Sequence, residues 1–235
     1  MNHNTHTSKQ FDAELNAVCE RVREMGELVE SQIRFALQAL VENDSYLMNQ
    51  VINDDHRVNA FEVEIDEQCN RIIARRQPTA NDLRMVMTII RTITDLERIG
   101  DEAKKIAYMA KRISQHEPTH RPRYTEIRHA TKLTLDMLHK SMDSFFRLDL
   151  STVAQVVRQD DLVDEEFRTI LRYLVTIMME NPRTITTSLN ILFVAKAIER
   201  IGDHAKNISE YVVYMVKGRD ARHIGADEIE RESGE

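Results

Sequence analysis

Apolar side chains recur every three or four residues along most of this chain, which is the spacing of one face of an α-helix. Polar breaks at Asn43–Ser45 and just before Asn81 supply side chains that cap helices. The clearest apolar stripe consists of Val86, Ile89, Ile90, Ile93, Leu96, Ile99, Ala103, Ile106 and Met109. The pattern predicts six long helices, over residues 8–42, 45–76, 80–114, 122–147, 150–180 and 184–217.

The composition removes most alternatives to a helical protein. The 235 residues include only 6 Gly and 4 Pro, whereas β-sandwiches and barrels need a turn about every 8–12 residues. No Gly-rich fingerprint of a nucleotide-binding fold is present. The net charge of −7 gives no electrostatic reason to expect nucleic-acid binding. Since the sequence has no apolar leader, no membrane-spanning run and no C-x-x-C motif, we expect a cytoplasmic protein.

The two halves of the sequence repeat each other. The string ERIGDEAKKI at Glu97–Ile106 returns as ERIGDHAKNI at Glu199–Ile208, with eight of ten positions identical. Pro78 and Pro182 occupy similar places in the two halves, and such self-similarity is typical of a tandem repeat. We therefore predict an all-α protein of two tandem antiparallel three-helix bundles. The predicted units are residues 1–117, residues 118–218 and an acidic tail at 219–235.

The repeated motif places two carboxylates at a spacing that destabilises a helix. Glu97 and Asp101 lie four residues apart, on one face of a helix, and so do Glu199 and Asp203; like charges there repel by a few tenths of a kcal/mol. Each pair also encloses a Gly, which costs roughly 1 kcal/mol inside a helix. One interpretation is a solvated surface with Gly permitting close helix packing. The other is a site for a hard cation, which would remove the repulsion.

A second pair of oxygen-bearing residues favours the cation site. Asp55 and Asn59, like Asp160 and Asp164, lie four residues apart on the preceding helix. Their distance from Pro78 or Pro182 places them at nearly the same height as the Glu-x-x-x-Asp pair on an antiparallel neighbour. The predicted metal ligands are Glu97, Asp101, Asp55 and Asn59 in the first repeat and Glu199, Asp203, Asp160 and Asp164 in the second. We expect His204 to be a partner of a carboxylate and not a metal ligand.

These motifs resemble those of the PhoU family, accessory regulators of the bacterial phosphate-specific transport system. The resemblance rests on both copies of E-R-I-G-D-x-A-K-x-I, on D-x-x-V-[ND] in the preceding helix, on RIIARRQPTA at Arg71–Ala80 and on VKG at Val216–Gly218. It implies two three-helix bundles, a homodimer, and clusters of iron, zinc, manganese or magnesium ions at the acidic motifs. Because Asn59 departs from the acidic pattern, we expect the first site to bind fewer or weaker ions than the second.

The resemblance also implies a function without catalysis. Members repress the phosphate-starvation response and phosphate uptake, as adaptors between the ATPase subunit of the phosphate ABC transporter and a sensor histidine kinase. Contact with the membrane would then be only indirect. The residues themselves leave two other functions open. A metallohydrolase or phosphatase would need an open coordination position and a metal-bound water, and a purely structural helical scaffold would bind no metal.

Overall fold

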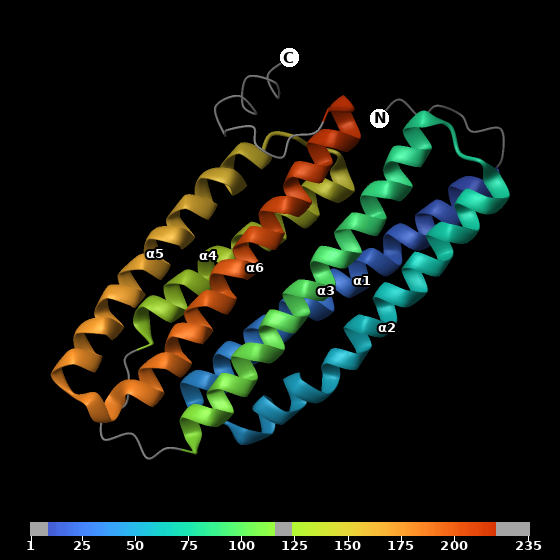
Figure 1. Ribbon diagram of the computed structural model, residues 1–235. Helices are drawn as coiled ribbons and strands as arrows, with labels where there is room; N and C mark the ends of the chain where they lie inside the picture. Colours follow the sequence, from blue (N-terminus) through green and yellow to red (C-terminus); the bar gives the residue numbers. More distant parts are fainter. Residues whose placement is uncertain (1–8, 116–123, 220–235) are drawn as a thin grey trace.

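The structure is a computed structural model that describes residues 9–115 and 124–219. Within these ranges the chain forms six α-helices and one short 3-10 helix (Figure 1). The helices are α1 (Lys9–Glu42), α2 (Ser45–Arg76), α3 (Ala80–Ser114), α4 (Thr125–Arg147), α5 (Val153–Glu180), the 3-10 helix η1 (Pro182–Thr184) and α6 (Ile185–Lys217). The prediction of two tandem antiparallel three-helix bundles is confirmed. The predicted boundary at 117/118 and residues 220–235 of the predicted tail lie outside the described residues.

Local side-chain chemistry explains where the helices begin and end. The Asp44 carboxylate accepts the backbone N–H groups of Tyr46 and Leu47 at 2.8 and 3.2 Å, which caps α2 as the sequence predicts. Helix α5 begins three residues later than predicted, because Asp149 accepts the N–H of Ser151 at 2.9 Å and holds a turn there. Helix α6 ends at Gly218, whose φ of 73° is readily adopted by glycine.

The two three-helix units share one hydrophobic core. Helices α3 and α6 lie side by side at the centre of the molecule and run antiparallel, and α2 and α5 lie at its outer edges (Figure 1). Helix α1 also contacts α4 across the two halves. One continuous cluster of buried apolar residues contains side chains from all six helices. The repeats are therefore halves of a single folding unit. Among the described residues, no helix has both the length and the apolar character needed to cross a bilayer.

The two motif glycines face neighbouring helices, Gly100 on α3 facing α2 and α1, and Gly202 on α6 facing α4 and α5. A Cβ atom added at Gly100 would lie 3.2 Å from Cγ1 of Val58, which is tighter than ordinary contact. At Gly202 the nearest atoms would be Cγ2 of Thr134 at 3.5 Å and Cγ1 of Val163 at 3.6 Å, which is ordinary contact. Close helix packing therefore accounts for Gly100, and less strictly for Gly202.

This difference predicts unequal changes in stability for two equivalent substitutions. Gly202→Ala should raise the free energy of unfolding by about 0.5–1 kcal/mol, because alanine restricts the unfolded chain and fits the helix. Gly100→Ala should gain less or lose stability, since Val58 must first move. Urea denaturation of both variants measures the difference, and equal gains would contradict this account of Gly100.

Candidate functional site

The first acidic cluster forms between α2 and α3, as the spacing predicts. Asp55 is buried, and its Oδ2 atom accepts a hydrogen bond from Lys104 Nζ at 2.6 Å. Lys104 Nζ also lies 3.9 Å from Oδ1 of Asp101. Burial raises the pKa of Glu97, and the negative charges of Asp101, Glu62 and Asp55 raise it further. Three of the predicted ligands thus share one electrostatic environment, whereas Asn59 is exposed.

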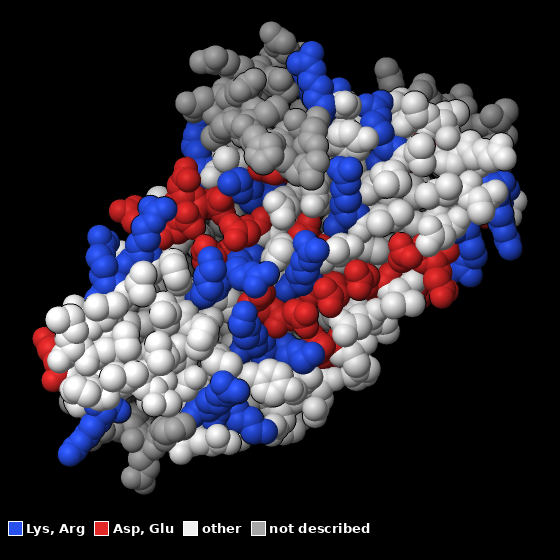
Figure 2. Space-filling view, in the orientation of Figure 1, with Lys and Arg blue, Asp and Glu red and all other residues white. Residues whose placement is uncertain are grey.

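The second acidic cluster repeats this arrangement between α5 and α6. Lys206 Nζ donates to Oδ2 of Asp160 at 2.8 Å, as Lys104 does to Asp55. Burial raises the pKa of Asp203 to about 6, with further contributions from Glu199, Asp160 and Asp164, while Lys196 opposes the shift. All four predicted residues of this repeat are therefore close enough to affect one protonation equilibrium. Figure 2 shows acidic side chains gathered in two groups on one face, with basic side chains between them.

Carboxylate oxygen atoms are the possible metal ligands in these two clusters. The Oδ1 atom of Asp55 is buried and has no hydrogen-bond partner, so one carboxylate oxygen remains available to a cation. Lys104 and Lys206 occupy the opposite oxygens of Asp55 and Asp160. In this arrangement the described residues contain no group of three or more His, Cys, Asp or Glu side chains placed to hold a metal ion. A cation would have to displace the lysine ammonium groups or draw the carboxylates together.

Glu62 is an additional member of the first cluster that the sequence analysis missed. Burial raises its pKa, and Asp66 and Asp101 contribute to the increase, whereas a hydrogen bond with Thr94 opposes it. The signal was present in the sequence, because positions 55, 59, 62 and 66 follow helical spacing along α2. In the second repeat Phe167 replaces Glu62, and Lys196, which replaces Thr94, lies 5.4 Å from its ring. The first cluster therefore contains an additional carboxylate, Glu62, at a position where the second cluster has the ring of Phe167 with Lys196 beside it.

His204 lies outside both clusters and contacts a carboxylate that the sequence analysis did not select. Its Nδ1 atom forms a 2.7 Å hydrogen bond with Oδ1 of Asp95, which is fully buried between α3 and α6. The same carboxylate accepts hydrogen bonds from Tyr211 OH at 2.7 Å and from Asn207 at 3.3 Å. The expectation that His204 partners a carboxylate is confirmed. Asp95 joins the two halves of the molecule through three donors from α6.

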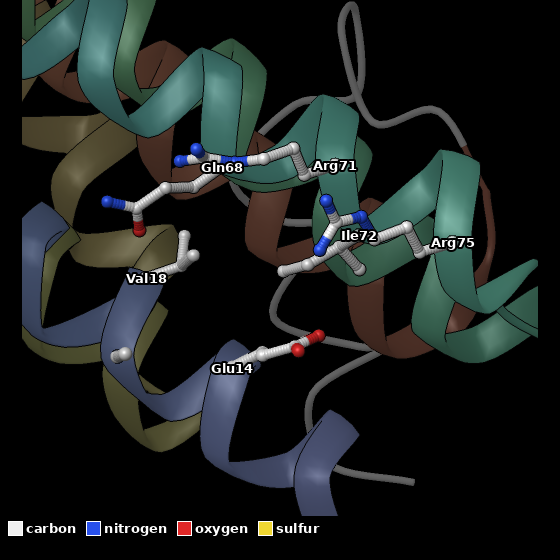
Figure 3. Close-up of a pocket in the computed structure, with 7 residues that line it drawn as sticks. Glu14, Val18, Gln68, Arg71, Ile72 and Arg75 are labelled. Atoms are coloured by element: carbon white, nitrogen blue, oxygen red, sulfur yellow. The ribbon is translucent and has the colours of Figure 1, made fainter.

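A separate pocket of about 320 Å³ lies between α1 and α2 (Figure 3). Val18 and Ile72 form its apolar lining, and Arg71 and Arg75 supply positive charge. The Glu14 carboxylate at its edge is held by Arg76 in two hydrogen bonds of 2.7 and 3.1 Å. A pocket with two arginines does not suit a cation.

Comparison with known proteins identifies the family. The PhoU domain matches residues 22–110 and 127–212, which is most of both three-helix units. The phosphate-specific transport system accessory protein PhoU of Serratia marcescens is 48% identical over 98% of this chain and 94% of its own length. The corresponding protein of Escherichia coli K12 is 46% identical over 98% of this chain and 95% of its own length.

Solved structures agree with the sequence matches. The crystal structure of PhoU from Pseudomonas aeruginosa superposes with a TM-score of 0.85 at 45% identity and covers 89% of this chain and 100% of its own. The phosphate transport system regulatory protein PhoU from Streptococcus pneumoniae gives a TM-score of 0.83 at 27% identity, over 89% of this chain and 98% of its own. The resemblance noted in the sequence is confirmed, and this chain belongs to the PhoU family.

Proposed function

We propose that this chain is a cytoplasmic negative regulator of the phosphate-starvation response and of phosphate uptake. It would act as a non-catalytic adaptor between the ATPase subunit of the phosphate ABC transporter and its sensor histidine kinase, and it would work as a homodimer. The regulatory role is supported by near full-length similarity to accessory proteins of phosphate-specific transport. The observation that carries the mechanism is the duplicated, partly buried acidic cluster, because burial and neighbouring carboxylates raise the pKa of Glu97 and of Asp203 despite the lysines nearby, and a bound cation would relieve that repulsion.

The ligands we propose are all oxygen donors. Asp55, Glu97 and Asp101, with Asn59, would hold the cation of the first repeat. In the second repeat the proposed ligands are Asp160, Asp164, Glu199 and Asp203. Carboxylate and amide oxygens favour Mg²⁺, Mn²⁺ or iron over Zn²⁺, which prefers nitrogen and sulfur ligands. The bound ion would supply positive charge, and this chain's helices would hold the carboxylates at fixed positions around it.

The extension of the first cluster changes the expected ranking of the two sites. Asn59 alone suggests a weaker first site, but Glu62 adds a carboxylate there that the second repeat lacks. In the second repeat Glu199 already accepts a hydrogen bond from Lys196 at 2.6 Å. We therefore propose that the first site binds cations at least as tightly as the second. Metal titration of Glu62→Gln tests this ranking, and unchanged affinity in that variant would refute it.

The adaptor role is tested by binding with and without metal. The purified chain should co-purify with the detergent-solubilised transporter and with the kinase, and a chelator should weaken at least one of these interactions. The variant Glu199→Gln/Asp203→Asn should lose metal by elemental analysis and show the same weakening without a chelator. Asp161→Asn, an exposed acid on α5 outside the proposed ligand set, is the control. Steady turnover of a phosphate monoester by the metal-loaded protein would instead support the hydrolase.

A further inference from the structure

The end of the second repeat exposes apolar side chains that the fold does not cover. On α5 these are Val175 and Met179, and on α6 they are Ile185, Leu189 and Phe193. Met179 is 79% exposed and Phe193 is 48% exposed. The residues on α6 are four apart, so they follow one face of the helix. Contiguous exposed apolar surface of this kind is typical of an interaction site.

The side chains on the two helices lie beside one another along the line where α5 packs against α6. Two contacts fix the antiparallel register of α5 and α6, Asp160 with Lys206 and Phe167 with Lys196. Continued toward the turn, this register places Val175 beside Leu189 and Met179 beside Ile185. The groove is therefore the continuation of the α5–α6 face that carries the second acidic cluster. We call Val175, Met179, Ile185, Leu189 and Phe193 the α5–α6 apolar groove.

The first repeat shows that the fold does not require this apolar groove. The equivalents of Phe167, Leu171 and Val175 on α2 are Glu62, Asp66 and Asn70. The α2 side of this helix pair is thus polar where the α5 side is apolar, whereas α3 keeps the exposed apolar residues Leu83 and Met87. Figure 2 shows the consequence, because acidic side chains extend along α2 and α3 whereas the α5–α6 end presents a broad uncharged area at lower left.

The charges around the groove indicate what it binds. Residues 168–196 contain four basic side chains, Arg168, Arg172, Arg183 and Lys196, but a single acidic one, Glu180, in a chain of net charge −7. Among the described residues, Arg172 and Arg183 have no carboxylate within ion-pair distance. Packing two copies of this surface together would bring like charges into contact, which disfavours self-association here. Complementarity instead requires a ligand that carries negative charge beside apolar side chains.

We propose that the α5–α6 apolar groove binds an amphipathic helix of a partner protein, with carboxylates along the edges of its apolar stripe. A groove between two antiparallel helices, with apolar side chains at helical spacing, accepts a third helix, as α4 already shows on the opposite side of α5 and α6. The inference rests on the proposed adaptor function, for which it supplies one partner surface. The groove lies next to the second acidic cluster, so the metal ion and the partner helix would both bind to α5 and α6.

Site-specific crosslinking tests the proposal in cells that contain the transporter and the kinase. The photocrosslinking residue benzoylphenylalanine is placed at Leu189 and, as a matched control, at the equivalent exposed position Met87 on α3. Mass spectrometry of the product from Leu189 should map a partner segment with apolar residues at helical spacing and flanking Asp or Glu. A product with a second copy of this chain, with lipid or with a basic segment overturns the proposal, and so does the absence of a product.

A synthetic peptide of the mapped segment then gives the affinity. Leu189→Glu/Phe193→Glu should weaken binding to the full chain at least tenfold, and Arg172→Glu should weaken it several-fold in low salt. The control Leu83→Glu/Met87→Glu, at the positions equivalent to Ile185 and Leu189, should bind normally. Equal effects of the two double variants would overturn the groove assignment. If the groove variant binds the peptide normally, the groove assignment is wrong, whatever happens to repression. If the groove variant fails to bind but phosphate-dependent repression persists, the groove does bind a partner and the adaptor proposal is wrong.

Discussion

Asp95→Ala should be the most destabilising substitution of a charged residue in this protein, lowering the free energy of unfolding by about 3 kcal/mol or more. Asp95 is fully buried where α3 meets α6. Its removal leaves His204, Asn207 and Tyr211 without their shared acceptor. Buried donors without an acceptor lose the hydrogen bonds that water gave them in the unfolded chain. A shift of the urea denaturation midpoint, with the slope unchanged, measures the loss.

Two further variants distinguish the cost of breaking the buried hydrogen-bond network from the cost of removing a negative charge. Asp95→Asn keeps one acceptor oxygen and should cost less than Asp95→Ala. Asp143→Ala removes a half-exposed acid whose Oδ2 lies 3.7 Å from Arg147 on the same helix, and it should change stability by less than about 0.5 kcal/mol. If Asp95→Ala proves as mild as Asp143→Ala, the network does not hold the two halves together.

The helices were predictable because their signals are local. The apolar stripe at 86–109 has the helical period, and its residues become the buried face of α3. Asp44 caps α2 as its position suggests, and the turn after Pro182 follows from a residue that cannot continue the preceding helix. The repeat then predicts that the second half copies the first. Only short corrections were needed, such as the turn at Asp149 that delays α5.

The contacts between the halves were not predictable, because they depend on differences between the repeats. Asp95 corresponds to Ala197, and His204 corresponds to Glu102. Glu102 instead forms an ion pair with Arg200 across the same helix pair, with Nη1 and Oε1 3.2 Å apart. A motif search selects positions at which the two repeats carry the same residue, whereas this interface depends on positions at which they carry different residues. Glu62 was missed for a related reason, since its counterpart Phe167 breaks the repeat.

The pH dependence of stability should distinguish the metal-free second cluster from an ordinary charged surface. The Asp203 pKa is raised from 3.8 to about 6, so the folded chain holds the proton more tightly than the unfolded chain. The stabilising contribution is therefore complete below the unfolded-state value and is lost as the pH rises through about 6. Asp203 remains partly exposed, so solvent screening reduces the size of the effect. Asp203→Asn should remove it and leave the metal-free variant more stable than the parent at pH 7.

Metal should reverse the sign of this substitution. A cation binds the deprotonated carboxylate, so added Mn²⁺ should stabilise the parent at pH 7, by about 2.7 kcal/mol for a site at a free concentration one hundred times its dissociation constant. Asp203→Asn should lose the contribution of the second repeat while keeping that of the first. Thermal denaturation of the parent and of Asp203→Asn, each in chelator and in Mn²⁺, gives the four stabilities to compare, and Asp161→Asn serves as a surface control. A parent that gains nothing from Mn²⁺, Mg²⁺ or iron would show that Lys206 and solvent already balance the acidic cluster, and the metal assignment would then be wrong.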